Sequence, residues 1–300
     1  MDTLVLSVVS RNYFNIPVWI GRSLGYFERE GLDVDIEHIE SIEAVNDRLR
    51  SGAAQLNYGV TEHVILDAEA GGQQTIIGGN VNKLPFSLIA HPSVTSIAEL
   101  RGKRIGVSSL RAGSSSLVMN LLAQHGLHYP DDYTLIPCGP ILARWEKLQA
   151  GEIDAGLQGA PMDQIARDAG YATLAGPADL ARDFQFTSLN VNADWAAGHR
   201  DLLLRFLRAF IRSHERFHAD RAAANRIAEQ EAGLSERYAD RTWHDFVRDG
   251  ILPIDGEANE AGIQAMIDTS GLIRDLPTRR LTSAAAYMDR SWLADARNSL

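Results

Sequence analysis

Residues 17–38, PVWIGRSLGYFEREGLDVDIEH, join a helical pattern directly to a strand pattern. The predicted helix spans Pro17–Glu30, and its apolar stripe consists of Val18, Ile20, Leu24 and Phe27. Gly31 follows this helix in the position where a glycine commonly ends one. A short β-branched run then predicts a strand at Val34–His38. A helix that leads straight into a strand is typical of an α/β fold.

The same alternation continues from the N-terminus to about residue 190, which indicates βαβ units and a mostly parallel sheet. The other predicted strands are Leu4–Val9, Leu56–Gly59, Thr75–Gly78, Ser87–Ala90, Arg104–Val107, Tyr133–Pro137 and Ala155–Leu157. The other predicted helices are Ala44–Arg50, His63–Ala70, Ser114–His125, Ala143–Ala150 and Met162–Ala169.

The sequence after Asn192 predicts helices and no further strand. The expected helices are Asp201–Ala219, Ala222–Glu231, Ser235–Asp249 and Asn259–Thr269, with Ser235 as an N-cap. This part is therefore interpreted as a helical wrap around the α/β part.

Two stretches of the α/β part follow one plan of strand, polar loop, helix and short strand. The first includes residues 8–12 and 50–56, and the second includes residues 106–109 and 149–155. Two similar α/β lobes with a cleft between them are therefore expected. Lobe one would comprise residues 1–84 and 190–300, and lobe two residues 85–189. The predicted hinge consists of Asn80, Asn82 and Lys83 together with residues 187–190.

Composition excludes several classes of function. The 29 Lys and Arg against 39 Asp and Glu give a formal net charge of −10, which argues against a nucleic-acid partner. The 45% hydrophobic and 23% charged content is that of an ordinary folded chain. A single cysteine, Cys138, excludes an internal disulfide and any site with several cysteine ligands.

The N-terminal residues 1–9 lack the basic start and the cleavage site of a secretory signal. No run approaches the 20 or so apolar residues that cross a bilayer. We therefore expect either a cytoplasmic protein or, where a leader has been removed, a periplasmic or lipid-anchored one.

Several stretches in order along nearly the whole chain resemble one family: residues 16–20, 25–34, 59–61, 97–107, 148–155 and 286–293. The family is the periplasmic solute-binding proteins for nitrate, sulfonate, taurine and thiamine precursors. The resemblance implies a two-lobed α/β fold of the type II periplasmic-binding-protein kind, with a helical C-terminal wrap. It also implies capture of a small solute between the lobes, with an ABC-type permease as a partner.

Polar residues that follow the predicted strands are the candidate ligand contacts, because ligands of open α/β sheets bind beyond the carboxyl ends of the strands. The loop after the first strand offers Arg11, Asn12 and Asn15. Asn12 and Asn15 have the alternative of being turn and cap residues only. Asn82 is a further candidate, at the crossing between lobes.

The serine-rich stretch after Arg104–Val107 is the expected anion seat. Ser109, Arg111 and Ser114 would supply hydroxyl groups, free helix N–H groups and a guanidinium to a carboxylate, sulfonate or phosphate. The alternative is a plain N-cap without a ligand. Thr61, Glu62 and Gln158 could face one another across the cleft, and Glu62 suggests an amine at the far end of the ligand. A capping role for Glu62 is the alternative.

The sequence contains no motif for a nucleotide loop, a nucleophile elbow or a metal cluster. His214 and His218 are spaced i, i+4, but they are interpreted as part of a solvated helix face. We therefore expect no catalytic residue, no metal and no cofactor.

An enzyme remains the alternative, because this fold also serves an aromatic sulfinate desulfinase and the pyrimidine synthase of thiamine biosynthesis. Residues 15–18 are similar to the desulfinase loop, where the residue before the proline is the nucleophilic cysteine, but Ile16 stands there in this chain. Cys138 is interpreted as buried and inert.

The sequence as a whole favours a monomeric solute-binding protein for a small organic anion or zwitterion, such as a sulfonate, a taurine-like molecule or an aromatic carboxylate. The alternatives are a cytoplasmic decarboxylase, lyase or desulfinase that acts on an aromatic acid, and a ligand-sensing module.

Overall fold

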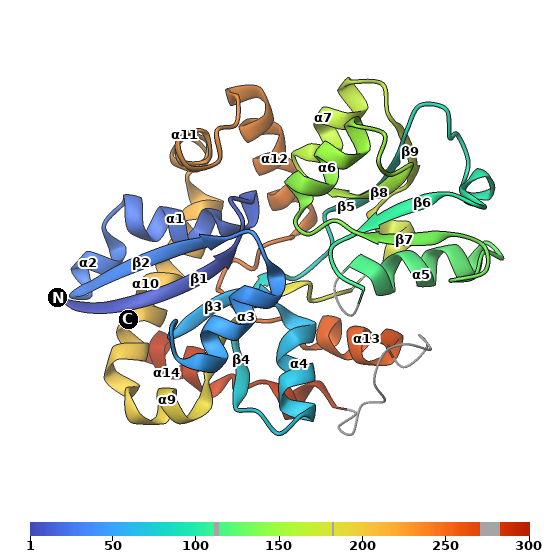
Figure 1. Cartoon of the computed structure of the whole chain (residues 1–300). Coiled ribbons are helices and arrows are strands. Elements are labelled where there is room, and N and C mark those ends of the chain that lie inside the picture. Colours follow the sequence, from blue (N-terminus) through green and yellow to red (C-terminus); the bar gives the residue numbers. More distant parts are fainter. Residues whose placement is uncertain (111–113, 182, 271–282) are drawn as a thin grey trace.

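The strands of this computed structural model, which describes residues 1–110, 114–181, 183–270 and 283–300, form two five-stranded sheets (Figure 1). The first has the order β2-β1-β3-β10-β4, and the second has the order β7-β6-β8-β5-β9. The first sheet consists of β1 (Asp2–Val9), β2 (Leu32–Ile39), β3 (Leu56–Val60), β4 (Gln74–Val81) and β10 (Thr187–Asn192). The second consists of β5 (Phe86–Ala90), β6 (Arg104–Val107), β7 (Thr134–Pro137), β8 (Ala155–Gly159) and β9 (Ala172–Ala175).

Helices cover both sheets. Those in the α/β part are η1 (Tyr13–Asn15), α1 (Ile16–Ser23), α2 (Tyr26–Arg29), α3 (Ile42–Ser51), α4 (Thr61–Glu69), η2 (Ile97–Leu100), α5 (Ser114–Gln124), α6 (Ile141–Gln149), α7 (Met162–Asp168) and α8 (Pro177–Leu180). Those after β10 are α9 (Ala193–Gly198), α10 (Arg200–Ala219), α11 (Arg221–Ala232), α12 (Glu236–Asp249), α13 (Glu260–Ser270), η3 (Ala284–Tyr287) and α14 (Ser291–Asn298).

The two sheets share one plan. In each, one strand pairs in parallel with two neighbours: β1 with β2 and β3 in the first sheet, and β6 with β7 and β8 in the second. An antiparallel strand then joins on the far side, β10 beside β3 and β5 beside β8. The predicted α/β fold with two similar sheets is therefore confirmed. None of the described helices is long and apolar enough to cross a membrane.

Two strands are absent from the sequence prediction. The sequence predicts only a hinge at residues 187–190, but β10 forms there and lies between β3 and β4. Its polar residues are buried and bond one another: the Asn190 amide donates to Asn57 Oδ1 at 2.8 Å, and the Ser188 hydroxyl to Asn190 Oδ1 at 2.6 Å. β9 is a short strand of four residues at the sheet edge. Neither carries the apolar run on which the prediction relied.

The single helix predicted at Pro17–Glu30 is wrong, because the chain forms α1 and α2 with a break between them. Gly25 adopts a left-handed conformation with φ of 69°, which interrupts the helix at little cost for a glycine. Ser235 stands at the N-cap position of α12 as predicted, but its side chain makes no capping hydrogen bond.

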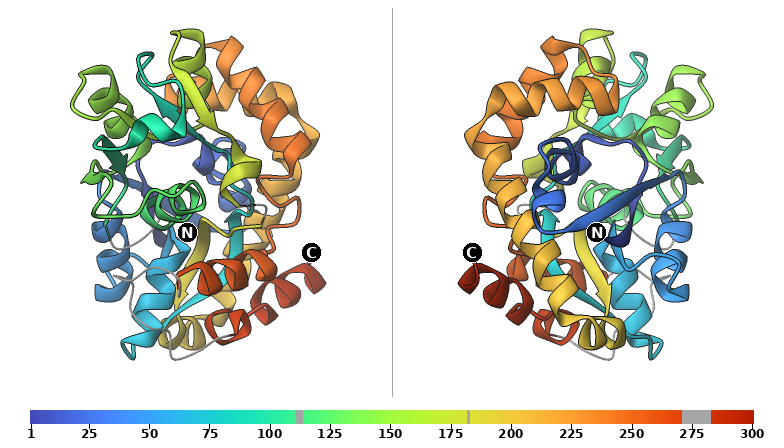
Figure 2. Two further views of the ribbon diagram at one scale, coloured as in Figure 1. Left: turned by 90° about the vertical axis from the view of Figure 1, so that its right-hand side faces the viewer. Right: turned by 90° about the vertical axis from the view of Figure 1, so that its left-hand side faces the viewer.

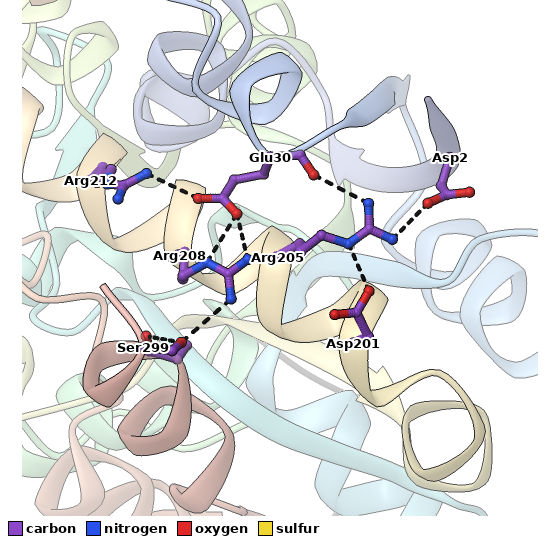
Figure 3. A network of polar contacts seen from close by, with 8 residues as sticks. Asp2, Glu30, Asp201, Arg205, Arg208, Arg212 and Ser299 are labelled. Carbon is purple, nitrogen blue, oxygen red and sulfur yellow. Dashed lines mark hydrogen bonds and ion pairs between the residues drawn. The ribbon is translucent and has the colours of Figure 1, made fainter.

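The wrap runs along one side of the molecule and returns the C-terminus to the first sheet (Figure 2). A group of arginines on α10 fastens it there (Figure 3). Arg208 and Arg212 bind the carboxylate of Glu30 at 2.6 and 3.0 Å, and Arg205 binds Asp2 at 2.6 Å. The Glu30 side chain is only 11% exposed, so these ion pairs are partly shielded from water.

Replacing Glu30 with glutamine is expected to lower the free energy of unfolding by about 2 kcal/mol, because two guanidinium groups lose their partly buried partner. Denaturant unfolding measures this change. Asp201→Asn is the matched control, since Asp201 pairs with Arg205 but is 86% exposed, and its loss should cost no more than about 0.5 kcal/mol. Equal effects of the two variants would contradict the special role of Glu30.

Candidate functional site

A small cavity lies between the two sheets and receives residues from both. It is lined by the loop after β1, by β3, β4 and the start of β10, and by the second-sheet segments before and within α6. The lining residues are Val9, Asn12, Phe14, Asn15, Ile42, Tyr58, Val60, Asn80, Ser108, Pro140, Ile141, Arg144, Phe186 and Thr187. Its volume is about 30 Å³, roughly the space of one water molecule in the liquid. The protein is therefore closed around this point.

The loop after β1 is shaped by Ser10 and Asn15. Ser10 has a φ of 53°, which is uncommon for a residue other than glycine, and its carbonyl accepts a hydrogen bond from the Asn15 amide at 2.8 Å. The Asn12 amide likewise donates to the Val9 carbonyl at 3.2 Å. Both asparagines hold the loop, so the turn role is observed for both; both also line the cavity, and ligand contact stays a prediction.

Arg144 is the charged group of the cavity. It lies on α6 and is 1% exposed. Its Nε donates to the Leu157 carbonyl at 2.6 Å and its Nη1 reaches the Gly139 carbonyl at 3.5 Å, and no carboxylate pairs with it among the described residues. Burial lowers the pKa of this guanidinium to about 10. A buried cation without a carboxylate favours the entry of an anion.

Two glycines make room for Arg144 against the second sheet. A Cβ on Gly106 of β6 would lie 3.1 Å from Arg144 Cγ, and one on Gly156 of β8 would lie 3.1 Å from Arg144 Cδ. Either contact is tighter than a side chain normally allows. The two bare strand positions therefore let the stem of Arg144 lie on the sheet, while its head reaches the cavity.

Two further polar groups of the cavity lack partners. Asn80 Oδ1 and Thr187 Oγ1 are buried and find no hydrogen bond among the described residues. Leaving such groups unpaired is costly. Asn80 Oδ1 can accept a hydrogen bond from a bound molecule or a water, and Thr187 Oγ1 can donate or accept one. Three aromatic residues, Phe14, Tyr58 and Phe186, also form part of the wall. The cavity therefore suits an anion that carries a planar or apolar body.

The predicted serine seat lies next to this cavity. Ser108 and Ser114 interlock, because the Ser108 N–H donates to Ser114 Oγ at 2.6 Å and the Ser114 N–H donates to Ser108 Oγ at 3.1 Å. The Ser108 hydroxyl thus accepts from the first N–H of α5, and Ser108 also lines the cavity. Ser109 lines the open hollow at the cavity mouth, together with Ser41, Glu40 and Glu43. Arg111 lies outside the described residues.

The other sequence candidates lie away from the cavity lining. Arg11 is 54% exposed and pairs with Glu231 of α11 at 3.2 Å. Thr61 donates to Ser188 Oγ at 3.0 Å, which ties α4 to β10. Asn82 donates to the Glu257 carbonyl at 2.8 Å and accepts from Gln185 at 2.9 Å, so it joins the crossing between the sheets to the wrap.

Two candidates are fully buried on the strand ends. Glu62 is 1% exposed in the first turn of α4. Gln158 on β8 is 0% exposed, and neither its amide nitrogen nor its oxygen has a partner among the described residues. Among the nine predicted contacts that the structure describes, only Asn12 and Asn15 line the cavity, and Ser109 and Ser114 lie next to it.

The interpretation of His214 as part of a solvated face is wrong, because the residue is 0% exposed. Its Nδ1 lies 2.7 Å from the Pro253 carbonyl, which can only accept, so its Nε2 accepts from the Tyr58 hydroxyl at 3.1 Å. Burial lowers the pKa of His214 to about 3. The ring is therefore neutral, and it fixes Tyr58 in the cavity wall.

The thiol of Cys138 is buried, as the sequence suggests, and burial raises its pKa. Its Sγ donates to the Ile136 carbonyl at 3.2 Å. Among the described residues, no group of three or more His, Cys, Asp and Glu side chains could hold a metal ion.

Comparison with known proteins gives both a family and a fold. The family model "NMT1/THI5 like" matches residues 12–224. The 4-amino-5-hydroxymethyl-2-methylpyrimidine phosphate synthase THI13 of Saccharomyces cerevisiae (strain ATCC 204508 / S288c) is 25% identical over 180 residues, which are 59% of this chain and 51% of that enzyme. The chain thus spans about half the length of this curated relative.

Solved structures match the whole chain. A protein of Bordetella bronchiseptica RB50 has a TM-score of 0.85 at 17% identity, covering 100% of this chain and 98% of its own. The alkanesulfonate-binding protein SsuA of Xanthomonas axonopodis pv. citri has a TM-score of 0.74 at 18% identity, covering 99% and 98%. A Candida albicans protein that has the generic periplasmic binding protein fold also matches, with a TM-score of 0.75 at 16% identity over 97% of each chain, and at these identities the likeness shows this fold. The family model matches more than half of this chain, and the chain therefore belongs to the NMT1/THI5-like family.

Proposed function

We propose that this protein captures a small organic anion or zwitterion in the cavity between its two sheets, with Arg144 as the anchor. The observation that carries the proposal is the buried guanidinium of Arg144, which has only carbonyl partners among the described residues. A carboxylate, sulfonate or phosphate would supply the missing negative charge and accept charge-assisted hydrogen bonds.

Capture requires the two lobes to separate and close again, because the present cavity has room for little more than a water molecule. The proposed lobes are residues 1–84 with 187–300, and residues 85–186; the boundary expected at 190 moves because β10 (Thr187–Asn192) lies in the first sheet. The chain crosses between them near Asn82 and at residues 185–187, where the Gln185 amide bonds the Val81 and Thr187 carbonyls. Closing on the ligand would exclude water and strengthen the contact with Arg144.

The remaining lining narrows the ligand class. Phe14, Tyr58 and Phe186 would contact an apolar or planar body, and Asn80 and Thr187 would bond its polar edge. An alkanesulfonate is one candidate, since SsuA is named for binding it. A phosphorylated aminopyrimidine is another, since the curated relatives are named as synthases of such a compound. Delivery of the captured ligand to an ABC-type permease belongs to the same proposal.

An enzyme that acts on an aminopyrimidine is the second candidate, and the 25% identity to the yeast synthase favours it. The two functions differ in their outcome. A binding protein returns the ligand unchanged, whereas an enzyme changes it during incubation. Mass spectrometry of the ligand after incubation separates them.

A thermal-shift screen tests the proposal. Alkanesulfonates, aromatic carboxylates and a phosphorylated aminopyrimidine are each added to the full chain, with their uncharged analogues as matched controls. A charged ligand at 100 times its Kd is expected to stabilise the protein by about 2.7 kcal/mol. The uncharged analogues should stabilise it little, because they leave Arg144 uncompensated. Equal stabilisation by charged and uncharged members of a pair would contradict the anion site.

A further inference from the structure

A second cavity, of about 330 Å³, lies on the seam between α12 and the second sheet and is called the seam cavity here. One wall is α12 with Ile251, and the other is formed by α7, α8 and the connection from β4 to β5. Its apolar lining comprises the buried residues Leu84, Pro85, Ala160, Phe246 and Ile251 and the accessible residues Pro177, Ala178 and Ala181. The volume and the apolar floor are those of a small-molecule pocket.

Charged side chains of both signs surround this apolar floor. Arg167 binds Asp163 Oδ2 at 2.9 Å across one turn of α7. Arg248 binds both Asp245, at 3.0 Å, and Asp249, at 2.6 Å, on the opposite wall. These pairs satisfy the two arginines and most of the carboxylate oxygens.

One carboxylate oxygen and one ammonium of the lining have no partner among the described residues. Asp163 is 6% exposed, and its Oδ1 has no hydrogen-bond partner among the described residues. Burial raises the pKa of this carboxyl, and Arg167 opposes the shift. Lys83 lies at the connection from β4 to β5, where it is exposed, and among the described residues its ammonium makes no hydrogen bond or ion pair. The wall formed by α7 and the connection from β4 to β5 thus offers one acceptor, Asp163 Oδ1, and one cation, Lys83.

We propose that the seam cavity binds a small zwitterion with an apolar body, such as a free amino acid, with its ammonium toward Asp163 and its carboxylate toward Lys83. The apolar body would lie on Pro177, Ala178 and Ala181, the apolar lining residues that are accessible to solvent. An anion without an ammonium would leave Asp163 unmatched, and an amine without a carboxylate would leave Lys83 unmatched. The site is separate from the Arg144 cavity and does not depend on the function proposed for it.

A ligand in the seam cavity would touch both sides of the molecule, because α12 already meets α7 there (Figure 1). The Gln164 amide donates to Asp245 at 2.8 Å, and Tyr238 and Arg237 bind Asp168 at 2.9 and 3.0 Å. Phe246 also stacks on Phe14, which lines the Arg144 cavity, with ring centroids 6.1 Å apart. The seam ligand would therefore stabilise the closed arrangement of the protein.

Titration calorimetry and amide NMR of the full chain test this site. The probes are L-leucine, L-methionine and 6-aminohexanoate, with 4-methylpentanoate and isopentylamine as matched anion and cation. At least one zwitterion is expected to bind with a Kd below about 10 mM and at least ten times more tightly than either matched probe. Amide shifts are expected at α7, α12 and residues 83–85.

Three variants locate the binding. Lys83→Gln should weaken it about ten-fold, as expected for one lost charge-assisted contact. Ala178→Phe, at an exposed position of the lining, should block it by filling the space. Lys147→Gln is the matched lysine control and should leave the affinity unchanged, since Lys147 is exposed and pairs with Glu152.

Several results would overturn the proposal. One is the absence of any amide shift with all three zwitterions at about 10 mM, a concentration far above the Kd of a functional site. Lys83→Gln and Ala178→Phe could both leave the affinity unchanged. Loss of binding in Arg144→Gln, with Lys83→Gln unaffected, would place the zwitterion in the other cavity. Each of these outcomes is distinguishable from a failure of the function proposed for Arg144.

Discussion

Arg144→Gln is expected to weaken anion binding by about 100-fold, the loss typical when one member of a buried charge pair is removed. Glutamine keeps an amide donor near the Leu157 carbonyl but carries no charge. Arg144→Lys should recover only part of the affinity, because an ammonium lacks the planar fork of donors. Titration calorimetry with the best anion of the thermal-shift screen measures both variants.

Arg11→Gln is the matched control for this prediction. Both residues are arginines, but Arg11 is 54% exposed and pairs with Glu231. Its loss should change anion affinity by less than two-fold or so, as for an exposed pair. If Arg11→Gln abolished binding and Arg144→Gln did not, the anion would bind at the loop after β1 and not in the Arg144 cavity.

Anion binding should also depend on pH in a defined direction. Burial lowers the pKa of Arg144 to about 10, so the free protein begins to lose this charge as the pH rises toward that value. A bound anion favours the charged form, so affinity should be constant at neutral pH and fall as the pH passes 10. In Arg144→Lys the anion affinity should fall at a different pH, because the group that loses its charge is then an ammonium.

Phe246→Ala is expected to lower the free energy of unfolding by about 4 kcal/mol, because a fully buried aromatic ring leaves a large cavity. The ring packs edge-on against Tyr13, with centroids 5.0 Å apart, and stacks on Phe14. It therefore joins α12 of the wrap to the loop after β1. Denaturant unfolding gives the value, and about 4 kcal/mol is a large part of the stability of a typical domain.

Two controls separate ring packing from a general effect of substitution. Phe246→Leu fills most of the space and should cost less than half as much. Ile254→Ala removes an apolar side chain that is 61% exposed, so it should change stability by no more than about 0.5 kcal/mol. A Phe246→Ala protein as stable as Ile254→Ala would show that α12 is not held by this contact.

The sequence predicted the architecture well because its signals are local. Apolar periodicity marked most strands and helices, such as β6 at Arg104–Val107, within a residue or two. Gly31 marked the end of the first helical stretch. The prediction failed where the local signal was absent. The polar residues of β10 are buried by bonds to Asn57 and Thr61, which lie more than 100 residues away in the chain.

The candidate site was predicted only in part, for the same reason. Asn12 and Asn15 follow a strand and were found by that rule, and they do line the cavity. Arg144 was missed because it lies one turn inside a helix, where an arginine usually faces water. Its burial depends on Gly106 and Gly156. These glycines make room for the stem of Arg144 only when β6 and β8 lie beneath α6.

The sequence by itself determined most of the helices and strands, the two-sheet α/β fold and the net negative charge, since these depend on residue pattern and composition. Only the tertiary structure decided which cation is buried, that His214 is neutral beside Tyr58, and where the seam cavity lies. These features arise from contacts between segments distant in the chain, and the free energy of a charge depends on the solvent that such contacts exclude.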